Sequence, residues 1–194
     1  NGTITGEDVF IPLDYIIGGV DQAGEGWKML TDCLSAGRAI VLPSGAMSGA
    51  KSAVAVTGSY ARAREQFGMP IAEFEGILEP LGRMAGKSYI ISSSVSTTAM
   101  AIGAGEKPSV ISAILKYHST ELAREIGRDA MDIHGGKAVM IGPKNYMAGG
   151  YESTPVGITV EGANIMTRSL IIFGQGAFRC HPYVLKEIEA VNIE

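Results

Sequence analysis

Apolar residues recur at helical spacing along most of the chain. The first such stretch runs from about residue 26 to residue 65 and predicts a long helical region. Pro43 lies inside it and should kink or split the helix, because proline lacks a backbone donor and clashes with the preceding turn. Gly68 and Pro70 then give a clear stop signal. The apolar positions that set the spacing are Trp27, Leu30, Leu34, Ile40, Val41, Ala50, Val54 and Ala61.

Three further stretches complete the pattern. A second helix is expected over about residues 71–102, and a third, the most regular, ends at His134. Residues 142–159 are rich in Gly and Pro and predict a loop with at most one short helical piece, and a last helix should begin after Glu161. Long helices joined by short turns predict an all-α fold, an antiparallel up-and-down helical bundle.

The first residues follow a different pattern. Residues 3–12 alternate like a strand, but no strand of similar strength follows that could pair with them. A lone strand cannot satisfy its own backbone groups. We therefore expect a fragment of a longer protein, with residues 1–22 a remnant strand and linker from a preceding β-domain and residues 23–194 a helical-bundle domain.

Composition narrows the classes of function. The net charge of −4 and the scattered Lys and Arg residues argue against nucleic-acid binding. The chain contains no uninterrupted run of 18 apolar residues, so we expect no transmembrane segment. Three separate histidines predict no metal site, and two distant cysteines are typical of free thiols in a reducing compartment. We expect a cytoplasmic protein, either free or peripheral to the inner membrane. The 46% share of hydrophobic residues favours an oligomer interface, or a missing domain that covers one face.

Glu161 is the main candidate for chemistry. It follows a β-branched stretch and precedes a helix start, where an acid can simply favour the helix dipole. The alternative is catalytic, because its neighbours Ile158, Val160 and Ile165 give it an apolar setting. Such a setting suits a carboxylate that removes a proton beside a carbonyl.

Two other segments carry candidate binding residues. Arg64 and Phe67 end the first helical region, and Gly135 and Gly136 end the third. Both sets can be ordinary helix ends, with a basic last turn and a glycine cap. As binding residues, arginine would suit a phosphate or carboxylate, and paired glycines would let the backbone approach a flat or phosphate-bearing ligand.

Together these segments resemble the C-terminal helical domain of the acyl-CoA dehydrogenase family, over nearly the whole chain. Within that family, the histidine before the glycine pair and the Asn-Ile-Met-Thr-Arg ending look closest to bacterial enzymes of fatty-acid β-oxidation. The segments that carry the resemblance, in order, are Gly6–Pro12, Gly24–Trp27, Leu34–Arg38, Tyr60–Ile71, Asp132–Gly136 and Glu161–Asn164.

The resemblance implies an FAD-dependent enzyme that converts fatty acyl-CoA thioesters to trans-2-enoyl-CoA. Glu161 would take the α-proton, its backbone N–H would help to hold the thioester oxygen, and Gly162 and Arg38 would lie near the acyl-CoA. The residues that would touch the FAD of a neighbouring subunit are Arg64, Phe67, Gly135 and Gly136. An electron-transfer flavoprotein would accept the electrons, and the protein would be a homodimer or homotetramer.

Two positions depart from the family pattern. Asp132 stands where the family often has Gln, and Ala163 where Thr usually follows the Glu-Gly pair.

Two alternative functions stay open. One is an acyl-CoA oxidase, which passes electrons to oxygen and would produce peroxide. The other is a non-catalytic helical oligomerisation domain, which would show no flavin absorbance.

Overall fold

The computed structural model of the chain describes residues 2–191, except for the side chains at positions 27, 28, 31, 32, 35, 36, 109, 175, 179 and 180. The chain divides into two compact units, Asn1–Ser35 and Ala36–Glu194. The division falls inside the first helix rather than at residue 22. The expectation that residues 1–22 derive from a β-domain therefore stays a prediction.

The first unit holds little regular structure before its helix. Residues 2–12 form neither helix nor strand, and two short 3₁₀ turns follow at Leu13–Tyr15 and Val20–Gln22. The strand expected at residues 3–12 is thus not formed in this structure. The physical reason is the one the sequence suggests, since a strand needs a partner and the described residues offer none beside it.

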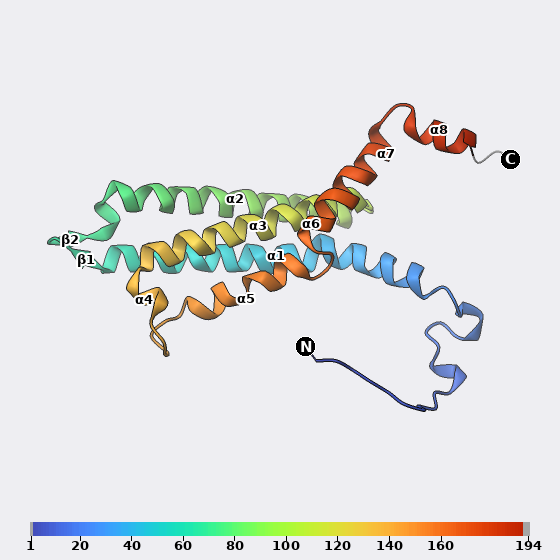
Figure 1. The fold of residues 1–194 in the computed structure, drawn as a ribbon. Helices are drawn as coiled ribbons and strands as arrows, with labels where there is room; N and C mark the ends of the chain where they lie inside the picture. The colour runs from blue at the N-terminus through green and yellow to red at the C-terminus, as the bar shows by residue number, and fades with distance from the viewer. Residues whose placement is uncertain (1, 192–194) are drawn as a thin grey trace. The chain divides into compact units, whose positions relative to one another are not determined.

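The rest of the chain is a helical bundle, which confirms the all-α prediction (Figure 1). Three long helices run antiparallel in succession, α1 (Gly26–Ala63), α2 (Glu75–Gly103) and α3 (Ser109–His134). A two-stranded hairpin, β1 (Glu65–Gln66) and β2 (Met69–Pro70), joins the first two. The later elements are α4 (Gly136–Val139), α5 (Ala148–Thr159), α6 (Asn164–Met166), a π-helix (Thr167–Gln175), α7 (Gly176–Cys180) and α8 (Val184–Val191).

The helices differ from the sequence-based expectation at three places. Pro43 does not split α1, because its ring is fully buried and this packing offsets the missing backbone hydrogen bond. The stretch expected as a loop contains the 12-residue helix α5, with Pro155 inside it, so packing against α3 overrides the low helix propensity of Gly and Pro. Helix α8 was not expected at all.

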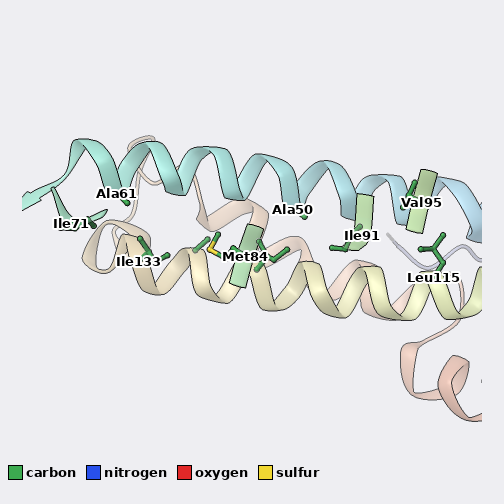
Figure 2. Packing of buried hydrophobic residues seen from close by; sticks show 10 residues of the cluster. Ala50, Ala61, Ile71, Met84, Ile91, Val95, Leu115 and Ile133 are labelled. Atoms are coloured by element: carbon green, nitrogen blue, oxygen red, sulfur yellow. The ribbon is translucent and has the colours of Figure 1, made fainter. Parts of the chain in front are cut away.

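The core lies between α1, α2 and α3 (Figure 2). Small residues of α1, Ala50 and Ala61, belong to the same buried cluster as larger residues of α2 and α3. The fully or nearly fully buried members from α2 and α3 include Met84, Ile91, Val95, Leu115, Ile126 and Ile133.

Helix α1 is also notably apolar. Among the described residues, its Gly37–Ala63 part is long and apolar enough to cross a membrane, and 17% of its most apolar window is buried. Two helical segments joined by a bend, Ala148–Thr159 and Asn164–Phe178, are long and apolar enough to cross a membrane only when they are counted as one span. Core helices of soluble proteins can be as long and as apolar, so the expected absence of a transmembrane segment stays a prediction.

An aromatic cluster closes one end of the bundle around His134. The ring of Tyr60 stacks on the imidazole at a centroid distance of 4.3 Å. Nδ1 of His134 lies 2.7 Å from the carbonyl of Ala130 and Nε2 lies 3.0 Å from the hydroxyl of Tyr146. A carbonyl can only accept, so Nδ1 carries the proton and Nε2 accepts from the tyrosine. Burial lowers the pKa of His134, whose residue is only 2% exposed.

This cluster should make the stability of the chain depend on pH. The pKa of His134 in the folded chain lies below its ordinary value of 6.5, so the unfolded chain binds the extra proton first. The contribution of His134 is therefore complete above pH 6.5 and is lost as the pH falls from there toward the lower pKa of the folded state. Thermal unfolding between about pH 5 and pH 8 should show a falling melting temperature on the acid side. His134→Gln should flatten this dependence, whereas His118→Gln, at an exposed position, should preserve it. Equal pH dependence in wild type and His134→Gln would contradict the assignment.

Candidate active site around Glu161

Glu161 lies in a tight turn between α5 and α6. Its φ angle is 54°, in the left-handed region that non-glycine residues rarely adopt, and Gly162 follows with φ 91°. Such a conformation costs on the order of 1–3 kcal/mol and persists only where the surroundings impose it. Gly162 has little room for a side chain, because a Cβ there would lie 3.0 Å from Oγ1 of Thr167, and its positive φ favours glycine. The turn is therefore held in place by its neighbours.

Arg38 of α1 is one of those neighbours. Its Nε donates a hydrogen bond of 2.9 Å to the backbone carbonyl of Glu161. The contact joins residues 123 positions apart, so only the fold brings them together. The structure thus places two sequence-predicted site residues, Arg38 and Glu161, side by side, with Gly162 adjoining both.

Lys116 of α3 holds the same turn from the other side. This lysine is 0% exposed, and its Nζ lies 2.9 Å from the carbonyl of Gly162, 2.6 Å from Oδ1 of Asn164 and 3.4 Å from the carbonyl of Ile158. Burial lowers the pKa of Lys116, the negative charge of Glu161 opposes that shift, and the positive charge of Arg38 adds to it. Sequence reasoning missed this residue, although a single lysine within the apolar third helix was a usable signal.

Asn164 and Thr167 complete the support. The Asn164 amide donates to Oγ1 of Thr120 at 3.0 Å and to Oε1 of Glu121 at 2.9 Å, and both of these residues belong to α3. Oγ1 of Thr167 donates to the carbonyl of Gly162 at 3.1 Å. The turn is therefore connected to α1, to α3 and to the π-helix that begins at Thr167.

The side chain of Glu161 stands apart from this network. Its Oε2 is buried and has no hydrogen-bond partner in the described part of the chain, where Oγ1 of Thr57 is the other such side-chain atom. Buried polar atoms in proteins are nearly always paired, so each exception calls for an explanation. An unpaired carboxylate oxygen at the end of a tightly held backbone is suited to accept a proton from a substrate.

The other predicted site residues lie toward the opposite end of the bundle. The β1–β2 hairpin and α4 lie near one end of the long helices, and α6 lies well away from them (Figure 1). Arg64 is exposed, Phe67 is 93% exposed with φ 54°, and Gly135 has φ 54° where it ends α3. A Cβ built at Gly135 or Gly136 would meet nothing within 4 Å, so the backbone there is open to a ligand. The structure does not bring these four residues together with Glu161.

A groove of about 820 Å³ runs between α1, α3 and α5. Its walls are mostly apolar and its glycines 45, 49 and 150 face open space, where an added Cβ would touch nothing. Sequence reasoning did not find it, because small residues on three separate helices make a groove only when those helices meet. The residues that line it include Leu42, Thr120, Val156 and Gly157.

Comparisons with known proteins identify the family and the fold of the chain. Residues 24–174 match the family model described as acyl-CoA dehydrogenase, C-terminal domain. The crystal structure of acyl-CoA dehydrogenase from Geobacillus kaustophilus superposes with a TM-score of 0.74 and 27% identity, over 78% of this chain and 39% of that chain.

Two curated relatives illustrate the range of matches. A 3-(aryl)acrylate reductase from Clostridium sporogenes is 33% identical over 130 residues, which is 67% of this chain and 33% of that protein. Protein HemX of Proteus mirabilis is 56% identical over 59 residues, which is 30% of this chain and 35% of that protein. The chain thus spans about a third of the length of these relatives. Because the family model covers most of its residues and the helical architecture agrees, this chain belongs to the acyl-CoA dehydrogenase family and corresponds to its C-terminal domain.

Proposed function

We propose that this chain is the C-terminal helical part of an FAD-dependent acyl-CoA dehydrogenase that converts fatty acyl-CoA thioesters to trans-2-enoyl-CoA. The observation that carries the proposal is the buried and unpaired Oε2 of Glu161, on a strained turn that Arg38 and neighbouring donors hold. A helix-start acid with no further role would not need this arrangement, because solvent or the backbone would satisfy it.

In the proposed reaction Glu161 acts as a base. Its carboxylate accepts the proton from Cα of the thioester, and the pair of electrons left there forms the double bond as hydride leaves Cβ. FAD, when bound, supplies the acceptor for that hydride. Arg38 keeps the backbone of Glu161 fixed through its carbonyl, so the carboxylate need not reorganise during proton transfer.

The residues at the other end of the bundle fit a flavin dinucleotide held by two subunits. Arg64 carries an exposed cation suited to a pyrophosphate, Phe67 offers an exposed ring, and Gly135 and Gly136 leave open backbone. Since these residues lie away from Glu161, they would serve the cofactor of a neighbouring subunit rather than their own. Exposed apolar side chains on α2, among them Leu78, Tyr89, Ile90 and Met100, support a homodimeric or homotetrameric assembly.

The electron partner and the cell compartment follow from the same proposal. The dehydrogenase would pass its electrons to an electron-transfer flavoprotein, and the proposal places the protein in the cytoplasm, either free or peripheral to the inner membrane. An oxidase would instead pass them to oxygen, so peroxide production by the loaded enzyme distinguishes the two.

The relative named 3-(aryl)acrylate reductase supports a second direction for the same chemistry. In a reductase, hydride would add to Cβ and Glu161 would deliver the proton to Cα. The residue and its surroundings are the same in both directions. Assays with a saturated and with an α,β-unsaturated thioester therefore decide between them.

The role of Glu161 predicts a selective loss of rate. In the full-length protein, Glu161→Gln should keep flavin and acyl-CoA binding but lower turnover by roughly 10²–10⁴-fold, because an amide cannot accept the α-proton. Glu152→Gln, at an exposed position on α5, is the matched control and should retain normal turnover. More than about a tenth of wild-type turnover in Glu161→Gln would sink the assignment.

The proposed contribution of other domains to the site predicts the behaviour of the isolated chain. The 194-residue chain should purify without colour and without activity, since much of the flavin and thioester site would belong to other domains. Absorbance near the flavin bands measures this directly. A yellow preparation with stoichiometric FAD would show that the helical part holds the cofactor unaided.

The apolar surface predicts self-association. We expect the isolated chain to form a dimer or tetramer through an interface on the order of 2,000 Å² or more, as obligate homo-oligomers bury. Light scattering at micromolar concentration gives the mass. A single species near 20.3 kDa would contradict this expectation.

A further inference from the structure

We propose that Lys116 is the positioning residue of the Glu161 turn, with its buried ammonium group clamping the backbone on both sides of the glutamate. The effect of Lys116 on catalysis rests on the proposed function, whereas its effect on the backbone of the turn rests on its hydrogen bonds alone. Lys116 touches no reacting atom in this scheme and acts through the turn.

The donor geometry supports the clamp. Nζ has three acceptors within hydrogen-bond distance, the carbonyls of Ile158 and Gly162 and Oδ1 of Asn164. Three donors are the full complement of an ammonium group, whereas a neutral amine has two, so the arrangement uses the charged form. The three acceptors bracket Glu161 in the sequence, three residues before it, one after it and three after it. A single side chain thus contacts the chain on both sides of Glu161.

The burial of the charge argues for a specific role rather than for packing. Lys116 is among the largest fully buried side chains of the described residues, and an apolar side chain of similar length would fill the same volume without desolvating a charge. What an apolar side chain would not provide is hydrogen bonding to the carbonyl of Ile158 in the last turn of α5 and to the carbonyl of Gly162. Gly162 in particular accepts from both Lys116 and Thr167, which holds its carbonyl between α3 and the π-helix.

Helix α3 makes the clamp rigid. Thr120 and Glu121 accept from the amide of Asn164, the same residue whose Oδ1 receives Nζ of Lys116. Oγ1 of Thr120 in turn donates to the backbone carbonyl of Lys116 at 2.8 Å. Lys116 therefore binds the oxygen of the Asn164 side-chain amide, and Thr120 and Glu121 bind its nitrogen. Because this helix packs against α2, α5 and the π-helix, the turn takes its position from the core of the bundle.

The test separates positioning from general stability. Amide hydrogen exchange of the chain should become about tenfold faster or more at residues 158–167 in Lys116→Met, because hydrogen bonds from a charged donor are lost there. Lys87→Met is the matched control. It also removes a bundle lysine, one that pairs with Glu125 between α2 and α3, and should leave residues 158–167 unchanged. If Lys116→Met loses protection throughout the bundle, Lys116→Arg becomes the deciding variant and should show the local pattern, because its planar fork cannot reproduce the three contacts.

Rate measurements on the full-length protein complete the test. Lys116→Met should bind flavin normally but lose about 100-fold in kcat, as expected when a reacting group is slightly misplaced. The same substitution should cause no further loss when combined with Glu161→Gln. Unchanged exchange at residues 158–167, a normal kcat, or an additive loss in the Glu161→Gln background would each overturn the inference. An active Glu161→Gln enzyme would instead overturn the proposed function and, with it, the catalytic meaning of the clamp, whatever the exchange pattern shows.

Discussion

The candidate site depends on how the turn at residues 160–164 is attached to α3. That attachment is made by a buried ammonium group, an amide and a hydroxyl, from Lys116, Asn164 and Thr120. In a low-dielectric interior these contacts are strong when complete and costly when broken. They hold Glu161 at a positive φ that its own backbone disfavours, and so leave its carboxylate with an unpaired oxygen.

The bundle provides the platform for this attachment through the small residues of α1. Ala50 and Ala61 are buried in the core with residues of α2 and α3, and the same helix carries Arg38 to the carbonyl of Glu161. Where α1 also lacks bulk toward α5, as at Gly45 and Gly49, the groove opens instead. One helix therefore serves the core, the turn and the groove with different faces.

The separation of functional residues between two ends has a consequence for assembly. The start of α6, which follows the Glu161 turn, lies far along the bundle from the β1–β2 hairpin and from α4 (Figure 1). A cofactor that meets both sets is more easily accommodated between copies of the chain than within one. This arrangement links the proposed chemistry to the apolar outer surface of α2, since both would be completed by a neighbour.

The sequence by itself determined the helical architecture and singled out Glu161 as the candidate base. Periodicity located α1 and α3 closely, since each has a long apolar pattern and a clear end, and Glu161 stood out through its setting and through ordered motifs. It did not locate α5, α8 or the course of the chain through Pro43, because packing there outweighs local propensity. Only the tertiary structure decided that Arg38 and Lys116 meet the same turn, from positions 123 and 46 residues away from their acceptors. Contacts at such separations leave no trace in local spacing, because they arise only when helices that are individually stable pack in one particular register.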